Sequence, residues 1–297
     1  MSFTAVRSTT KKDLDIARAG ETSVFGPEWL IGTTRAAYPG LMDRATVFGE
    51  VAQTYNRLRP RYPDAMYDDL INETGVEVGS PVLEIGCGTG IATTELGRRG
   101  LQVDAIDPDP RMLRLTREKV TGLEVRCIER SFEDYNSDAE SYSLVFAASS
   151  WHFVDTQTGL PKAANLLNQT GSLAVCWNLP RPEALPRPSS LDAAYRKFAP
   201  KLADVASHVK NRTQEHRRQA ITASNLFTEP MSFSYPWTKT LSSADYTDLL
   251  STHSDHRMLG MQTLAALLTA LRDEIDQNGG TIELAYETVL YVAHKLT

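Results

Sequence analysis

The sequence has few cysteines, no long apolar run and no block of basic residues, and each of these absences excludes a class of protein. Its three cysteines, Cys87, Cys127 and Cys176, are widely spaced. This spacing fits neither a disulfide framework nor a metal site, so we expect reduced thiols and no bound metal. No stretch of about 18 apolar residues exists to cross a membrane, and the N-terminus lacks the apolar core of a secretory signal. We therefore expect a cytoplasmic protein that does not bind membranes.

The charge balance also limits the possible partners. The formal net charge is -6 over 297 residues, and the densest basic stretch, 210–218, also contains Glu215. Because a protein that follows phosphates needs a concentrated positive surface, we expect no nucleic-acid partner. With 41% hydrophobic residues, the chain can bury the core of one elaborated domain or of two small ones.

Short apolar strands alternate with helical segments through the middle of the chain. The expected strands cover residues 81–85, 102–106, 123–128, 143–147 and 172–177. The expected helices between them cover residues 91–99, 110–120 and 162–168. This alternation with short links predicts an α/β fold with a parallel sheet and helices on both faces.

The pattern divides the chain into four parts. Residues 1–44 are weakly patterned and form either a flexible leader or a lid over a pocket, whereas residues 45–178 carry the alternating core. Residues 179–228 begin with several prolines and continue as a polar helical region without strands, which predicts an inserted cap. Residues 229–297 return to the sheet and add helices on the expected substrate side.

The most informative motif is the run VLEIGCGTG at residues 82–90. A buried strand leads directly into a glycine-rich turn, and the next strand ends in Asp107 at about the distance where the dinucleotide fingerprint has its ribose-binding acid. Glycines allow a ligand to approach the backbone closely, so this pair of features predicts a nucleoside pocket. The third glycine comes one residue earlier than in the dinucleotide fingerprint, and Glu84 precedes the first one.

These two departures resemble motif I of the class I S-adenosylmethionine-dependent methyltransferases. Four further stretches are similar to that family in the same order: residues 105–113, 129–134, 147–155 and 171–178. The resemblance implies a Rossmann-like sheet of seven strands with helices on both faces and the last strand antiparallel. It also implies that the cap is inserted after the fifth strand, and that the cofactor is S-adenosyl-L-methionine, with S-adenosyl-L-homocysteine as product.

Two other segments resemble a narrower group, the small-molecule methyltransferases of type 11 and the trans-aconitate-methyltransferase-like enzymes. They are the tyrosine-bearing helix and its continuation at 55–63 and the segment LSTHSDH at 250–256. The resemblance starts near residue 45 and runs to the end, but it leaves out much of 180–228. Substrate choice should depend on the parts outside the resemblance.

The resemblance implies a set of cofactor-binding residues, which are Tyr55, Arg59, Glu84, Gly86, Cys87, Gly88, Gly90, Asp107, Pro108, Phe132 and Ser149. Asp107 suits the two ribose hydroxyls, and Glu84 or Ser149 suits the ammonium group of the ligand. Tyr55 and Arg59 suit its carboxylate, and Phe132 offers an apolar edge to the adenine.

Each of these assignments has a plainer structural alternative. Asp107 is also placed to cap the following helix, and Glu84 is placed to interact with the dipole of the helix after the glycines. Phe132 is an ordinary core aromatic in the alternative reading. Tyr55 and Arg59 then form a helix surface with a paired arginine.

Two histidines are candidates for a general base. His152 follows the fourth strand of the core, at the carboxyl edge where open α/β sheets bind ligands. His256 lies close to His253 and Asp255, an arrangement that orients an imidazole as a base or caps helices. We expect no metal at this cluster, because the sequence shows no third ligand beside the two histidines.

The expected function is methyl transfer to the oxygen, nitrogen or carbon of a small molecule, such as an aromatic or heterocyclic intermediate of secondary metabolism. The chain would act as a monomer or homodimer. One alternative is an NAD(P)-dependent Rossmann oxidoreductase, against which the glycine spacing and Glu84 argue. Another is a protein of this fold that binds the cofactor without transferring the methyl group.

Overall fold

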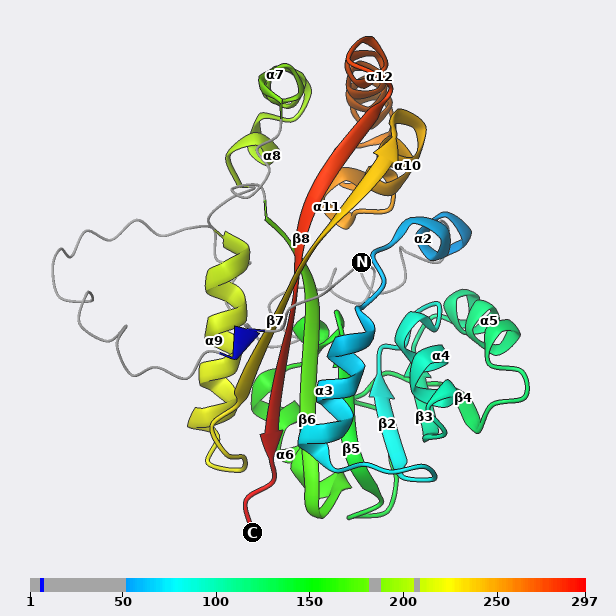
Figure 1. Ribbon diagram of the computed structural model, residues 1–297, viewed down its shortest axis with the longest axis vertical. Helices are drawn as coiled ribbons and strands as arrows, with labels where there is room; N and C mark the ends of the chain where they lie inside the picture. Colours follow the sequence, from blue (N-terminus) through cyan, green and yellow to red (C-terminus); the bar gives the residue numbers. More distant parts are fainter. Residues whose placement is uncertain (1–5, 8–51, 182–187, 206–208) are drawn as a thin grey trace, which may run out of the picture.

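The computed structural model describes residues 6–7, 52–181, 188–205 and 209–297, and most of the expected N-terminal arm lies outside these ranges. One mixed sheet runs through the molecule (Figure 1), in the order β1-β7-β8-β6-β5-β2-β3-β4. Its strands are β1 (Val6–Arg7), β2 (Pro81–Ile85), β3 (Gln102–Asp107), β4 (Val125–Glu129), β5 (Tyr142–Ala148), β6 (Leu167–Pro180), β7 (Met231–Ser242) and β8 (Thr281–His294).

Seven of these strands confirm the predicted sheet. Strands β2 to β6 pair in parallel, and β8, the last strand, is antiparallel to both β6 and β7. The two-residue strand β1 adds an antiparallel edge to β7 that the sequence did not predict. Because the parallel strands run in one direction, the glycine loop after β2 and Asp107 at the end of β3 lie at the same edge of the sheet.

Helices cover both faces of the sheet, as predicted. They are α3 (Asp64–Thr74), α4 (Ile91–Arg98) and α5 (Pro110–Lys119), and α6 (Thr156–Leu166) and α9 (Val209–Ala223). Leucines and other apolar residues of α3, α4 and α5 belong to one buried cluster with the sheet, while α6 and Ile221 of α9 belong to another. One sequence expectation was wrong: Leu167 and Asn168 begin strand β6 instead of ending a helix.

A third buried cluster lies beyond the carboxyl edge of the sheet. Strands β7 and β8 extend past the end of β6 as a two-stranded ribbon and continue pairing to Ser242 and Thr281. The ribbon carries α10 (Ser243–Ser251), α11 (Ser254–Arg257) and α12 (Met261–Gln277), and α7 (Ser189–Phe198) and α8 (Pro200–Val205) lie beside them. Leu191, Leu249, Leu271 and Ile282 are among the buried members of this cluster.

The described helices of the predicted insertion, residues 179–228, pack in two different places. Its first two helices, α7 and α8, join the C-terminal helices in one layer, which we call the upper helical layer (α7, α8, α10, α11 and α12). Its last helix, α9, packs on the sheet through Ile221. The reason is that α7 has an apolar side, including Leu191 and Tyr195, that packs against α12 and belongs to the third buried cluster.

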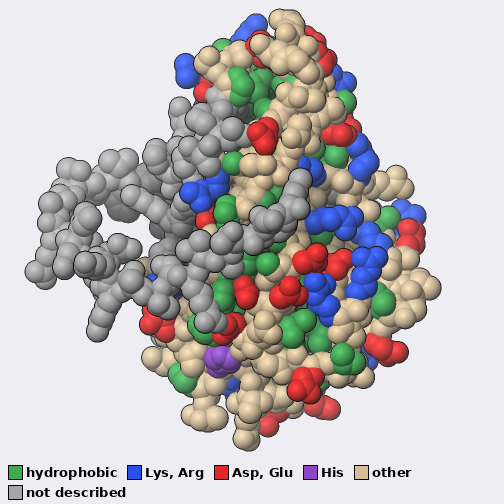
Figure 2. Space-filling model, in the orientation of Figure 1, with side chains coloured by type: hydrophobic (Ala, Val, Ile, Leu, Met, Phe, Trp, Pro, Cys, Tyr) green, Lys and Arg blue, Asp and Glu red, His purple; other side chains and the backbone are tan. Residues whose placement is uncertain are grey.

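Helix α2 (Ala52–Leu58) contacts both α5 and α10, and so lies between the sheet edge and the upper helical layer. On the face shown in Figure 2, basic and acidic side chains are intermixed. Within the described ranges, no helix has the length and apolarity needed to span a membrane.

Candidate functional site

The glycine loop at residues 86–90 leaves open space at its tip. Gly86 and Gly88 both have positive φ angles, of 65° and 56°. A Cβ on Gly86 would lie 2.5 Å from the Cβ of Ser150, whereas a Cβ on Gly88 would meet no atom within 4 Å. Gly86 is therefore required for packing against the segment after β5. Gly88 presents bare backbone to an open region that a ligand can approach.

Glu84, two residues before the loop, is a buried carboxyl group with an oxygen that lacks a partner. The residue is 1% exposed, and its Oε2 atom has no hydrogen-bond partner. Burial raises the pKa of Glu84 to about 8; Thr93 lowers this pKa and the Asp107 charge raises it. The group is thus mostly neutral at pH 7, and a cation beside Oε2 would favour its ionised form.

Asp107 ends β3 and binds the glycine loop directly. Its Oδ2 accepts a hydrogen bond from Gly88 N at 2.9 Å, and its Oδ1 accepts one from Asp109 N at 2.9 Å. Burial raises the pKa of Asp107 to about 6, although these two backbone bonds lower it. The helix-cap alternative for Asp107 is wrong, because Asp109 caps α5 by accepting from Arg111 N. Each Asp107 oxygen keeps a lone pair for a ligand hydroxyl.

The segment after α2 lies close to the end of β5. The hydroxyl groups of Tyr62 and Ser149 are 2.9 Å apart, and Ser149 has a left-handed backbone with φ of 56°. Arg59 is half-buried and donates to Thr252 O of the α10 end at 3.2 Å. Tyr55 lies on α2, but its side chain is outside the described part of the structure. The sheet edge thus has Ser149 on one strand end and the Tyr62 segment against it.

Three other predicted cofactor residues are buried or half-buried and show no polar group directed at a ligand. Phe132 is 4% exposed and packs 6.1 Å from Trp151, ring centroid to ring centroid, within a buried cluster. This is the core position that the alternative reading expected, so its contact with adenine stays a prediction. Cys87 is buried, and burial raises the pKa of its thiol, which disfavours a nucleophilic thiolate. Pro108 is half-buried directly after Asp107.

His152 lies in a short 3-10 turn after β5, beside aromatic and cationic groups. Trp177 Nε1 donates a long hydrogen bond of 3.5 Å to His152 Nδ1, and the Phe153 ring centroid is 4.1 Å away. The residue as a whole is exposed, although protein groups surround its ring. Crowding by protein atoms, and then the charges of Arg217 and Arg59, hold the pKa of His152 below its usual range. The lowered pKa keeps the imidazole neutral at pH 7 and also makes it a weaker base than an ordinary histidine.

His256 is buried in the upper helical layer and uses both ring nitrogens. Nδ1 lies 2.8 Å from Asp255 Oδ1, and Nε2 lies 2.9 Å from the hydroxyl of Tyr195 on α7. One potential metal-binding atom from each of His253, Asp255 and His256 lies within 4.8 Å of the others, so Asp255, named in this cluster from the sequence, adds a third donor to the two histidines. The hydrogen bonds already explain the arrangement, because Asp255 orients the imidazole toward Tyr195.

Sequence reasoning also missed Arg217 on α9. Its guanidinium carbon lies 5.8 Å from the ring centroid of Trp177, and burial lowers the pKa of Arg217 to about 10. No sequence signal marks this residue, because it stands in a polar helix with several other basic residues. Only the return of α9 onto the sheet brings Arg217 to the same neighbourhood as His152.

Comparison with known proteins finds a stretch of this chain that is similar to methyltransferases. Residues 82–171, from β2 to the start of β6, match the family described as "Methyltransferase domain". An uncharacterized methyltransferase of Mycobacterium bovis is 35% identical over 136 residues, which cover 46% of this chain and 54% of that protein. A probable S-adenosylmethionine-dependent methyltransferase of Saccharomyces cerevisiae is 28% identical over 148 residues, covering 48% of this chain and 50% of that protein. This chain thus spans about half the length of the curated relatives it matches.

The fold has a counterpart among solved structures. A phosphoethanolamine N-methyltransferase of Haemonchus contortus, in complex with phosphomonomethylethanolamine and S-adenosylhomocysteine, aligns with a TM-score of 0.50 and 13% identity. The alignment covers 86% of this chain and 59% of that one. The Rossmann-like methyltransferase fold expected from the sequence is confirmed. The narrower trans-aconitate-methyltransferase-like group stays a prediction.

Proposed function

We propose that this protein binds S-adenosyl-L-methionine at the carboxyl edge of its sheet and transfers the methyl group to a small-molecule acceptor. The observation that carries the proposal is the buried Oε2 of Glu84, which lacks a partner beside the open tip of the glycine loop. This atom lies in the stretch 82–171 that matches the methyltransferase-domain family, and Glu84 interacts with a second buried carboxyl group, Asp107.

The residues present suit the ribose, the ammonium group and the carboxylate of the cofactor. Asp107 receives the ribose hydroxyls with the lone pairs that its two backbone bonds leave open. Glu84 receives the ammonium group, and this cation relieves the cost of burying the carboxylate. Arg59 follows α2 and donates to Thr252 O at the end of α10. We assign it, together with Tyr55, to the carboxylate of the cofactor.

The chain's own contribution to methyl transfer is mainly positioning. The bound cofactor supplies an electrophilic methyl carbon on a sulfonium. The residues around it hold the acceptor atom in line with that carbon and exclude water. An acceptor that loses a proton needs a base, and His152 is our candidate because it follows β5 at the carboxyl edge of the sheet. Its lowered pKa makes it a weaker base than an ordinary histidine, so this role suits an acceptor that is itself acidic. His256 has less support for this role, since both of its nitrogens face protein groups.

The region around His152 favours an aromatic or heterocyclic acceptor. Trp177 lies with its ring centroid 6.3 Å from that of Tyr291, and Trp237 stacks on Tyr286 at 4.6 Å. Tyr286 is mostly buried, and its pKa is raised to about 12 by burial. Trp177 is 4% exposed, so the half-buried Trp237 beside Tyr286 is the tryptophan that offers stacking to a flat acceptor. We assign such acceptors, including natural-product intermediates, as the first compounds to screen.

Calorimetry with S-adenosylhomocysteine tests the cofactor assignment. The Asp107→Asn variant keeps the shape of the side chain but removes its charge, and we expect about a tenfold or greater loss of affinity. The matched control is Asp138→Asn, which changes an exposed carboxylate. An unchanged affinity in Asp107→Asn would rule out the ribose assignment. Binding of NADH in place of S-adenosylhomocysteine would favour the oxidoreductase alternative.

Methyl transfer itself needs a second experiment. The full-length chain is incubated with methyl-labelled S-adenosylmethionine and a panel of phenols, amines, carboxylates and heterocycles. We expect label in one acceptor class, and loss of that label in His152→Ala only if the acceptor releases a proton. Tight cofactor binding with no labelled acceptor would instead favour a protein that binds the cofactor without transfer.

A further inference from the structure

Helix α5 contacts the glycine loop through two side chains that lie one helical turn apart. The hydroxyl of Thr116 donates to Gly88 O at 2.7 Å, and the ammonium of Lys119 donates to Thr89 O. Residues three apart on a helix share a face, so both donors point to the same side of α5. Two successive carbonyl groups of the loop are therefore held by one helix.

The same helix is also tied to the ribose-side acid. It begins at its cap, Asp109, whose backbone N–H donates to Asp107 Oδ1. The N-terminal end of α5 thus follows Asp107 directly, while its C-terminal half holds the glycine loop. Because each peptide group is planar, fixing Gly88 O also sets the direction of the Thr89 N–H.

Lys119 also contacts helix α2, which lies away from the sheet edge. Its ammonium donates to Asn56 Oδ1 on α2, and an ammonium group has three donors, enough to serve both acceptors. Asn56 is next to Tyr55, and α2 leads to Arg59; both residues are assigned above to the carboxylate of the cofactor. Burial, and then the charge of Arg61, lower the pKa of Lys119 to about 8. One desolvated cation joins three elements around the site.

We propose that Lys119 is a positioning residue that clamps the glycine loop to α2 and α5, so that the two ends of the cofactor meet a preformed site. Thr116 supports it by holding the preceding carbonyl. The inference rests on the proposed function for its consequence, which is cofactor affinity, but the clamp itself is a property of the protein without ligand. Lys119 does not touch the reacting atoms in this assignment, so its loss should affect binding more than the chemical step.

The test compares three variants of the full-length chain. Lys119→Met removes the donors and keeps a long side chain, Lys119→Arg keeps donors, and Arg114→Met removes an exposed cation from the same helix as the matched control. Hydrogen bonds from charged groups predict about a tenfold or greater loss of S-adenosylhomocysteine affinity in Lys119→Met. We expect partial recovery in Lys119→Arg, no loss in Arg114→Met, and kcat at saturating cofactor within about threefold of the unsubstituted protein.

A second measurement needs no ligand. Cys87 lies inside the loop and is 6% exposed, so a looser loop should expose its thiol to a maleimide. We expect Cys87 to be labelled about tenfold faster in Lys119→Met than in Arg114→Met, with the labelled residue identified by mass spectrometry. A tenfold change corresponds to about 1.4 kcal/mol less free energy needed to open the loop. Unchanged labelling together with unchanged affinity would overturn the clamp. If the unsubstituted protein binds no S-adenosylhomocysteine, the proposed function fails, while the labelling rates still decide whether Lys119 holds the loop.

Discussion

The cofactor side of the site and the upper helical layer are built in different ways. On the cofactor side, Glu84, the glycine loop and Asp107 come from one short stretch of chain, and backbone atoms make many of the contacts, such as Gly88 N to Asp107. In the upper layer, the contacts join side chains that are distant in sequence, such as Tyr195 with His256. A pocket made by local backbone geometry leaves a motif in the sequence, whereas a pocket made by distant side chains does not.

The difference also extends to charge. The cofactor side keeps two buried carboxyl groups, Glu84 and Asp107, whose pKa values are raised by burial to about 8 and about 6. In the upper layer and along α2, charged groups are mostly exposed and paired, as Arg57 is with Asp245 and Asp248. The two buried carboxyl groups therefore lower the free energy of unfolding until a cationic ligand binds beside them. The exposed ion pairs of the second region raise it only modestly.

The largest effect should come from replacing a glycine whose backbone conformation and close packing shape the cofactor side. In Gly86→Ala the new Cβ would lie 2.5 Å from Ser150 Cβ, in addition to a φ of 65°. We expect a loss of about 3 kcal/mol in the free energy of unfolding, measured by urea denaturation, and loss of S-adenosylhomocysteine binding. Gly88→Ala is the matched control, because its Cβ meets open space and only the left-handed strain of about 1 kcal/mol applies.

Equal losses of stability in Gly86→Ala and Gly88→Ala would contradict this account. They would mean that backbone conformation alone, and not the close approach of the segment after β5, determines the need for glycine. A Gly88→Ala variant that folds normally but binds no cofactor would sharpen the comparison instead. It would show that the open space at the loop tip is used by the ligand.

The next effect concerns the buried charge at Glu84. The folded state holds this proton up to a pKa of about 8, against an ordinary value of 4.5, so Glu84 makes the protein less stable as the pH rises from about 5 to about 9. We expect Glu84→Gln to remove a few kcal/mol of this pH dependence, measured by denaturation at several pH values. The exposed Glu124→Gln is the control and should leave the pH dependence unchanged.

Cofactor binding gives an independent reading of the same group. At pH 7 the unliganded Glu84 is mostly protonated, and the ammonium of the ligand favours its ionised form. We therefore expect binding to release about one proton, measured by calorimetry in two buffers of different ionisation enthalpy. Binding of the ligand without proton release, or the same release from Glu84→Gln, would remove Glu84 from the ammonium site.

The parallel sheet, and the meeting of the glycine loop with Asp107 at its edge, were predictable from the sequence. The strands around VLEIGCGTG are buried on both faces, and their apolar runs separate cleanly from the helices between them. The joint layer of α7 with α12 was not predictable, because either helix alone shows only an apolar side and not what covers it. The contacts of Arg217, Lys119 and Thr116 were not predictable for the same reason. Each depends on a loop or an aromatic ring that only the folded chain brings close to the residue.

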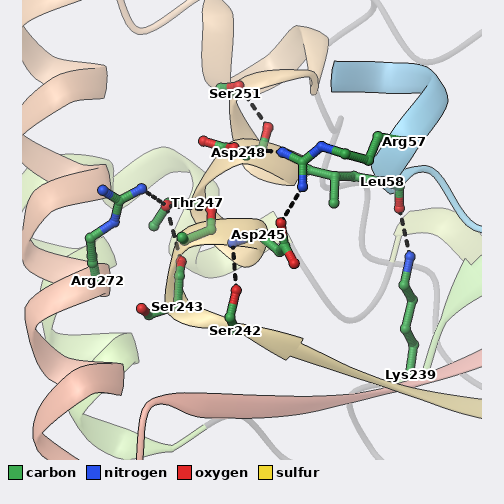
Figure 3. Close-up of polar contacts among 11 residues, drawn as sticks. Arg57, Leu58, Lys239, Ser242, Ser243, Asp245, Thr247, Asp248, Ser251 and Arg272 are labelled. Carbon is green, nitrogen blue, oxygen red and sulfur yellow. Dashed lines mark hydrogen bonds and ion pairs between the residues drawn. The ribbon is translucent and has the colours of Figure 1, made fainter. Parts of the chain in front are cut away.

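The smallest effect tests whether the two regions are coupled through α2. Arg57 on α2 reaches Asp245 and Asp248 of α10, and Lys239 donates to Leu58 O at 2.8 Å (Figure 3). Arg57 is 54% exposed, so solvent and salt screen its pairs. We expect Arg57→Ala to lower the thermal midpoint slightly, to lose this difference at high salt, and to change S-adenosylhomocysteine affinity less than about twofold.

The control for this prediction is Arg98→Ala, which removes an exposed ion pair within α4. Both variants should behave alike if α2 is held mainly by Lys119 on the cofactor side, because the α10 contact is then a screened surface pair. A large loss of cofactor affinity in Arg57→Ala, but not in Arg98→Ala, would contradict the separation of the two regions. It would show that the upper helical layer sets the position of α2, so that acceptor-side contacts would influence cofactor binding through Arg57.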